Sequence, residues 1–96
     1  MTLEQYLQTH GLQNAMQQPL YLVEHQYRGA TYSDCFETAA QALQEAQTRW
    51  KHLPAVQQHH HHILVWSARL TGTQIQKNGE DLFELDFLKK LWDSKQ

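Results

Sequence analysis

Apolar side chains recur at every third or fourth position over residues 36–53, and this regularity is the strongest in the chain. Such spacing is typical of an amphipathic helix that packs one face against a core. Asp34 and Glu37 match the capping box that starts a helix, and Pro54 marks its end. We therefore expect a helix over residues 34–53. Its core-facing residues would be Phe36, Ala39, Leu43, Ala46, Trp50 and Leu53.

Two other segments have a period of two, which is typical of β-strands. Residues 20–27 alternate in this way and are followed by Gly29, a turn residue. Residues 60–70 also alternate, and both of their faces are partly apolar. A strand that is apolar on both faces suits the centre of a sheet that is covered on more than one side.

Beyond these strands the pattern predicts a turn at residues 71–73 and a hairpin over residues 74–85. Asn78 and Gly79 have the chemistry of a type I′ turn at the hairpin's tip. The second strand of this hairpin would direct its apolar residues inward.

Short helices are expected at both termini. Residues 2–10 carry apolar side chains on one helical face, with Thr2 as the N-cap and Gly11 at the end. Residues 12–18 are expected to form a turn or a broken helix. From Asp86 the helical period returns, which predicts a short C-terminal helix with an apolar arc of Phe87, Leu88, Leu91 and Trp92.

Together these elements predict a single α+β domain over residues 1–96, in the order α-β-α-β-β-β-α. We expect a small antiparallel sheet of three to four strands with the long helix packed on one face. Hydrophobic residues make up 41% of the chain, and they include three Trp, four Tyr and three Phe. Burial of this content offsets the entropy lost when the chain becomes ordered, so we expect a folded protein.

The charge pattern argues against a nucleic-acid partner. Ten acidic residues outnumber eight basic ones, and the basic residues are scattered rather than arranged along a row of phosphates. No apolar stretch reaches the length that spans a bilayer, and the N-terminus does not resemble a signal peptide. Cys35 is the single cysteine, so no intramolecular disulfide forms. We expect a soluble, cytoplasmic protein that binds neither nucleic acid nor membrane.

Four consecutive histidines, His59–His62, lead into the predicted central strand. Alternate side chains of a strand point the same way, so His60 and His62 would share one face and His59 and His61 the other. Either pair has a spacing that metal sites use, but a structural zinc site needs four ligands and a catalytic one needs three and a water. No third ligand is evident beside either pair. We predict no metal and no cofactor, and we interpret the run as a solvated junction; adventitious metal capture and a pH switch are the alternatives.

Motifs of catalysis are not found in the sequence. There is no Gly-rich phosphate loop, no Gly-x-Ser-x-Gly and no His-Glu-x-x-His. At the start of a helix the thiolate of Cys35 would be favoured by the helix dipole, whereas Asp34 beside it would disfavour that thiolate. A small buried hydrophobe is the alternative role for this cysteine. We predict that the protein is not an enzyme.

Acidic residues gather near the C-terminus, and Trp92 follows them on an element with an exposed end. Charges of one sign steer a partner, and an exposed aromatic side chain anchors it. We therefore expect a non-catalytic protein-binding domain, such as a small bacterial or phage adaptor or inhibitor. The predicted partner-binding residues are Glu80, Asp81, Glu84, Asp86 and Trp92. The alternatives are a solvated acidic edge without a partner, a metal- or ligand-binding protein that uses His59–His62, a small enzyme or enzyme subunit, and a homodimer formed through the aromatic residues.

Overall fold

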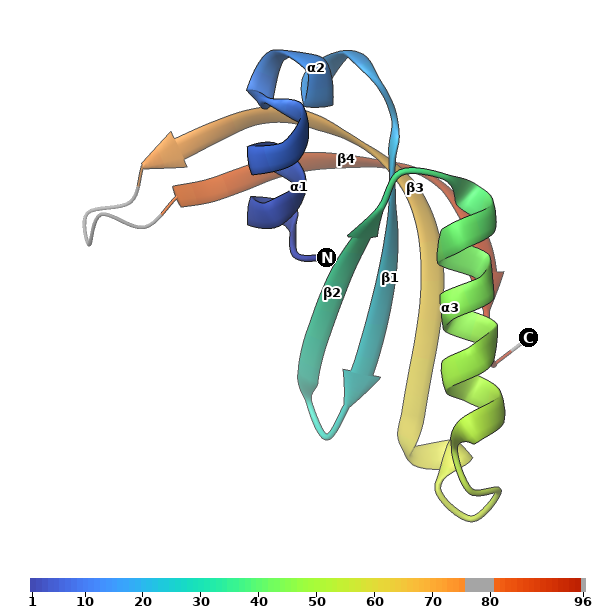
Figure 1. Cartoon of the computed structure of the whole chain (residues 1–96). Coiled ribbons are helices and arrows are strands. Elements are labelled where there is room, and N and C mark those ends of the chain that lie inside the picture. The colour runs from blue at the N-terminus through green and yellow to red at the C-terminus, as the bar shows by residue number, and fades with distance from the viewer. Residues whose placement is uncertain (76–80, 96) are drawn as a thin grey trace.

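The protein folds around one four-stranded antiparallel sheet with the strand order β2-β1-β3-β4 (Figure 1). The computed structural model describes residues 1–75 and 81–95, so the turn predicted at Asn78 and Gly79 lies outside the described residues. The helices are α1 (Leu3–His10), α2 (Leu12–Gln17), α3 (Ala39–His52) and the 3₁₀ turn η1 (Gln58–His60), and the strands are β1 (Leu20–Tyr27), β2 (Ala30–Phe36), β3 (His61–Ile75) and β4 (Asp81–Asp93). The expected α+β class is confirmed, with one long helix packed on the sheet and short helices beside it.

Helix α1 begins and ends where the sequence predicts. The Thr2 hydroxyl accepts a hydrogen bond from the backbone N–H of Gln5, and the Gln5 side chain accepts one from the N–H of Thr2. This reciprocal capping box satisfies two backbone donors at the helix start. Gly11 follows the last turn with a φ of 78°, which glycine adopts without strain. Residues 12–18, expected to be a turn or a broken helix, contain the short helix α2.

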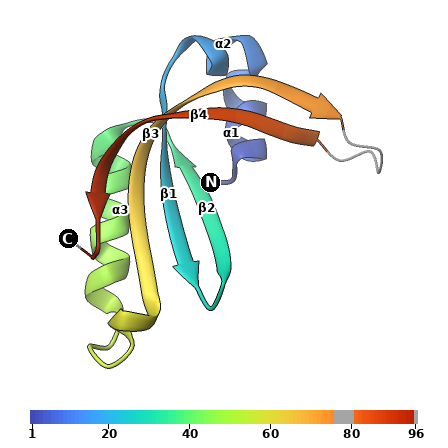
Figure 2. The ribbon, with the colours of Figure 1, turned by 180° about the vertical axis from the view of Figure 1, so that it is seen from behind.

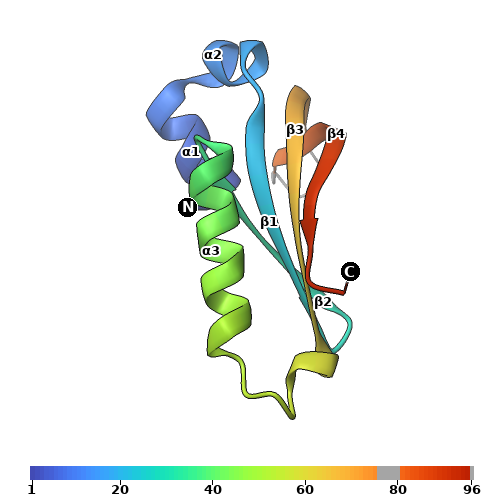
Figure 3. The ribbon, with the colours of Figure 1, turned by 90° about the vertical axis from the view of Figure 1, so that its right-hand side faces the viewer.

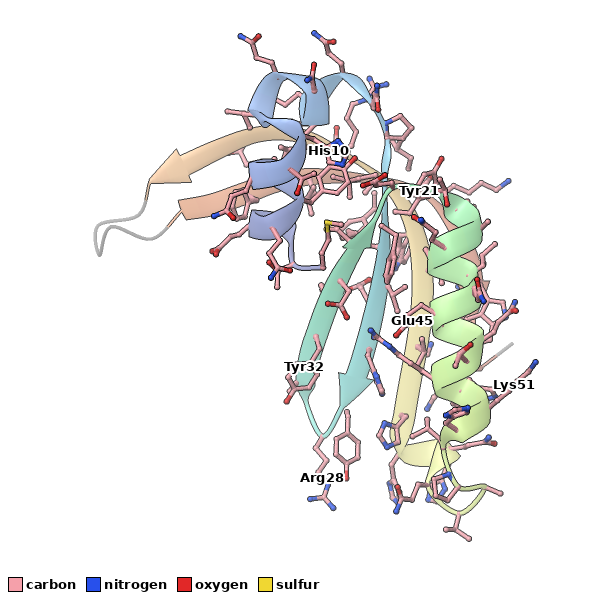
Figure 4. All side chains as sticks on the ribbon, in the orientation of Figure 1. His10, Tyr21, Arg28, Tyr32, Glu45 and Lys51 are labelled. Carbon is pink, nitrogen blue, oxygen red and sulfur yellow. The ribbon has the colours of Figure 1, made fainter. Side chains whose placement is uncertain are left out.

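Strand β1 covers the predicted residues 20–27 and turns directly into β2. Arg28 and Gly29 link the two strands with φ values of 52° and 78°. Two consecutive positive φ angles are the signature of a type I′ turn, which fits the twist of a two-stranded hairpin. Figure 4 shows Arg28 at the free tip of this hairpin and Tyr32 projecting from β2.

The long helix begins at Ala39 and not at Asp34, so the predicted start was wrong. Asp34 lies in β2, whose backbone groups pair with β1 along its whole length. Thr38 is the actual N-cap, because its hydroxyl accepts a hydrogen bond of 3.2 Å from the N–H of Gln41. The carboxylate of Asp34 instead accepts a hydrogen bond of 2.6 Å from Arg49, near the far end of α3.

Helix α3 lies along one face of the sheet (Figure 3). Its contact line is formed by Ala42 and Ala46, which are completely buried. Leu43 and Trp50, predicted core residues, are partly buried and pack against the same cluster. The core-facing arc is therefore centred on two alanines, with the larger apolar side chains along its flanks.

The turn predicted at residues 71–73 was wrong, because β3 continues through this segment to Ile75. Thr71 is an extra residue in the pairing: its two neighbours on β3 pair with the consecutive residues Leu85 and Glu84 of β4. Such a β-bulge bends a strand without ending it. Strands β3 and β4 accordingly curve together away from the hairpin of β1 and β2 (Figure 2).

The C-terminal helix predicted from Asp86 was also wrong, because this segment belongs to β4. Leu88 and Leu91 are each left over where the register of β4 against β3 shifts. Each bulge adds one residue to the alternation, so the apolar residues from Phe87 to Trp92 acquire the spacing of a helix while the chain remains extended. Strand β3 pairs with β1 along one side, and its other side supplies the backbone partners of β4. The sequence pattern alone does not reveal this pairing.

Two apolar clusters lie on opposite faces of the sheet, because neighbouring residues such as Leu22 and Val23 point in opposite directions. The first cluster joins the sheet to α1 and α2 and contains Tyr6, Ala15, Leu20, Leu22, Cys35, Ala68 and Leu70. The second lies under α3 and contains Val23, Ala42, Ala46, Ile63 and Val65. Strands β1 and β3 contribute to both clusters, so the prediction of a central strand covered on two sides is confirmed for β3.

Candidate functional site

The residues of the predicted partner-binding surface are found in different environments. Glu80 lies outside the described residues, and Asp81 is the first residue of β4. Glu84 and Asp86 are exposed farther along this strand. Trp92 is only partly exposed and packs against the cluster under α3. Glu84 and Asp86 therefore lie on an exposed stretch of β4, whereas Trp92 is not an exposed terminal anchor.

Strand β4 forms one edge of the sheet, with β3 on its inner side. Phe87 and Leu88 lie next to each other on β4 and are 50% and 55% exposed. An edge strand presents backbone N–H and C=O groups that another chain can pair with. These two residues were not predicted as site residues, because the sequence pattern placed both on the apolar arc of a C-terminal helix. The register shift after Phe87 makes Leu88 an extra residue, and no local signal in the sequence indicates that shift.

Charged residues flank the two exposed apolar side chains. Asp86 precedes them and Lys89 follows them, and both charged residues are exposed. We call Asp86, Phe87, Leu88 and Lys89 the edge patch. Phe87 also contacts Trp66 on β3, with ring centroids 5.3 Å apart at an angle of 60°, which fixes one side of the patch against the sheet.

The opposite edge of the sheet, β2, is partly covered by the chain itself. The backbone N–H of Cys35 donates a hydrogen bond of 2.7 Å to the carbonyl oxygen of Met1. Helix α1 also contacts β2. Part of this edge is therefore occupied by the N-terminal segment.

The histidine run crosses the boundary between η1 and β3, and His61, the first residue of β3, is buried. Its Nδ1 lies 2.8 Å from Nε2 of His25 on β1, and the Tyr27 ring stacks on it at a centroid distance of 4.2 Å. His61 is buried and His25 is partly buried. The burial of His25 lowers its pKa, and positive charge on His61 and Arg49 lowers that pKa further. In a hydrogen bond between two imidazoles one ring donates and the other accepts, so the pair is complete when at least one ring is neutral.

His62 points to the other face and meets the end of β4. Its Nε2 lies 2.6 Å from Oδ1 of Asp93, and Nζ of Lys90 lies 3.0 Å from the other carboxylate oxygen. The pKa of Asp93 is lowered to about 2, mainly because the backbone N–H of Lys95 donates to the carboxylate. Burial opposes this shift, and the hydrogen bonds from Lys90 and His62 add to it. These contacts fasten the end of β4 to the start of β3.

His59 and His60 remain exposed on η1, with their ring centroids 3.9 Å apart. The interpretation as a solvated junction therefore fits these two residues and not the two that follow. Within residues 1–75 and 81–95, no three His, Cys, Asp or Glu side chains are placed to hold a metal ion. The nitrogens that His25 and His61 direct at each other are already used in the hydrogen bond between them.

Cys35 lies in β2 and not at a helix start, so the proposed help from a helix dipole does not apply. Its side chain is buried, and burial raises the pKa of the thiol to about 11, with the positive N-terminus lowering it and Asp34 raising it. The residue lines an open groove of about 510 Å³ between β2 and α3. A buried thiol that stays protonated at neutral pH acts as an apolar core residue and not as a nucleophile.

Comparison with family models, with curated proteins and with solved structures gives no match to this chain. Among the helices of the described residues, none combines the length and the apolar character needed to cross a bilayer.

Proposed function

We propose that the protein is a non-catalytic protein-binding domain that uses the edge patch on β4. The observation that carries this proposal is the pair of adjacent, half-exposed apolar residues, Phe87 and Leu88, on an edge strand. An incoming strand would pair with the backbone of this edge, while the two side chains supply apolar contact area. Phe87 and Leu88 replace Trp92 as the anchor, since Trp92 packs under α3.

The acidic residues of β4 act on the encounter with the partner. Glu84 and Asp86 are exposed on the same strand as the patch. Negative charge near a docking edge favours a partner with basic residues and speeds its approach. Reversal of both charges to lysine should therefore slow association and weaken its dependence on salt.

The proposed class is an adaptor or an inhibitor that acts in the cytoplasm. A small domain without a catalytic centre works through its surface, and binding is what adaptors and inhibitors have in common. A free cysteine such as Cys35 is usual in a reducing compartment, which supports the cytoplasmic location.

Capture of a partner from an extract of the source cells tests this proposal. A Phe87→Ser, Leu88→Ser double variant should lose the partner that the unmodified protein retains. Leu12 is the matched control, because it is an apolar residue of similar exposure on α2. Leu12→Ser should retain the partner. Loss of the partner with Leu12→Ser, or with serine in place of His59 and His60, would place the binding surface elsewhere.

A further inference from the structure

The bulge at Leu88 changes which charged side chains of β4 share a face. Asp86 pairs with Arg69 on β3, and Lys89 pairs with Ser67. Arg69 and Ser67 are two residues apart, so they point to the same face of the sheet. Asp86 and Lys89 therefore also share a face, although three positions separate them in the sequence. Without the extra residue they would lie on opposite faces.

This arrangement makes the edge patch complementary to itself. In an antiparallel pair of identical strands, a two-fold axis perpendicular to the sheet keeps each side chain on its own face. If that axis passes between Phe87 and Leu88, then Asp86 of each copy lies opposite Lys89 of the other. Phe87 of each copy lies opposite Leu88 of the other. Opposite charges and apolar side chains in directly opposed positions stabilise strand pairing.

We propose that the edge patch binds a second copy of this chain, with the two β4 strands antiparallel about an axis between Phe87 and Leu88. This inference rests on the proposed function, because it names the partner of the same edge. The sheets of the two copies then join into one continuous sheet. The β2 edge does not take this role, because Met1 and α1 already occupy part of it.

The dimer is expected to be weak. Pairing of one short stretch of strand buries an area at the small end of protein interfaces, below about 1,200 Å². Lysines and bulges on an edge also discourage pairing with unrelated strands. An unrelated strand would leave the charges of the patch unmatched, whereas a second copy matches both of them, so the same features favour self-association over other partners.

Sedimentation equilibrium over a wide concentration range tests the dimer by exchange of charges. Asp86→Lys and Lys89→Asp should each weaken the dimer about tenfold, because each places like charges opposite one another twice. An equimolar mixture of the two variants should recover the affinity, because every facing pair then joins opposite charges again. Lys51→Asp changes the net charge as Lys89→Asp does but lies on the exposed side of α3, so it should have no effect.

Recovery in the mixture also separates the interface from folding. Position 86 faces Arg69 within the same chain, and any effect of Asp86→Lys on that contact is the same in the single variant and in the mixture. A monomer at all concentrations would overturn the dimer. So would a dimer that both single variants leave intact, or a mixture as weak as the single variants. If the unmodified protein is monomeric but the Phe87→Ser, Leu88→Ser variant still loses a captured partner, the dimer fails and the proposed function stands. If the protein neither dimerises nor retains a partner, both fail.

Discussion

At the scale of single residues, neighbouring histidines have different roles because they meet different environments. His61 is buried between His25 and Tyr27, whereas His62, the next residue, meets the carboxylate of Asp93 on the other face. The alternation of a strand produces this division, and the sequence predicts the alternation. The partners themselves come from β1 and β4, so their identity depends on the strand register.

The pair of His25 and His61 should make stability depend on pH. The pKa of His25 is lowered in the folded protein, whereas a histidine of the unfolded chain titrates near 6.5. As the pH falls below about 6.5, the unfolded chain takes up the proton first, so stability is lost until the pH passes the folded pKa. The urea concentration at the midpoint of unfolding should therefore be lower at about pH 5 than at about pH 8.

His25→Gln should make that difference smaller, because the amide still forms a hydrogen bond with His61 but does not titrate. His52→Gln is the control, since His52 is an exposed histidine on α3. Equal pH dependence in the His25 variant and the unmodified protein would show that the pair does not couple folding to protonation.

Asp93 should stabilise the protein over a different range of pH. The pKa of its carboxyl group is lowered from 3.8 to about 2, so its stabilising effect is complete above pH 3.8 and is lost as the pH falls through about 2. Asp93→Asn should lower the free energy of unfolding by about 1–3 kcal/mol at neutral pH, because charged hydrogen bonds are replaced by weaker ones. The difference should disappear near pH 2 in denaturant titrations. Glu4→Gln, at an exposed site on α1 outside the edge patch, should change stability little.

Local sequence signals predict the structure of some helices and strands, whereas the structure of others depends on pairing with residues far away in the sequence. Thr2 and Gly11 bound α1, and the alternation over residues 20–27 identifies β1, so both elements could be read from the sequence. The segment from Asp86 onward could not. Its two bulges, at Leu88 and Leu91, insert residues into the alternation and reproduce helical spacing in a strand. The exposure of the candidate site depends on the same register, which is why it was missed.

The alanines of α3 should be sensitive to an increase in side-chain size. Ala46 is completely buried between α3 and the sheet, so Ala46→Leu should cost about 1–3 kcal/mol through overpacking. Ala40→Leu is the same substitution at an exposed position of the same helix and should cost little. Denaturant midpoints measure both effects. Equal midpoints would show that α3 is not packed along the line of Ala42 and Ala46.

At the scale of the whole molecule, the two clusters share the central strands of one sheet. Leu22 and Val23, neighbours on β1, belong to different clusters, and β3 contributes to both in the same way. A change in one cluster therefore acts on strands that the other cluster needs. The sequence predicts the apolar faces of these strands, but it does not predict that α1 and α2 cover one face while α3 covers the other.

Loss of Tyr6 should destabilise both clusters together. Tyr6 is buried in the first cluster, so Tyr6→Ala should cost about 3–5 kcal/mol by leaving a cavity between α1 and the sheet. Trp50 and Trp92 pack against the second cluster, whereas Trp66 packs against the first. In a Trp66→Phe background, tryptophan fluorescence therefore reports on the part of the molecule that Tyr6 does not touch. Because β1 and β3 are common to both clusters, the urea transitions seen by fluorescence and by circular dichroism should shift by the same amount and still coincide. Tyr32→Ala, which removes an exposed tyrosine from β2, should shift neither transition. If Tyr6→Ala moves the dichroism transition while the fluorescence transition stays in place, then the N-terminal helices unfold separately and the two clusters are independent.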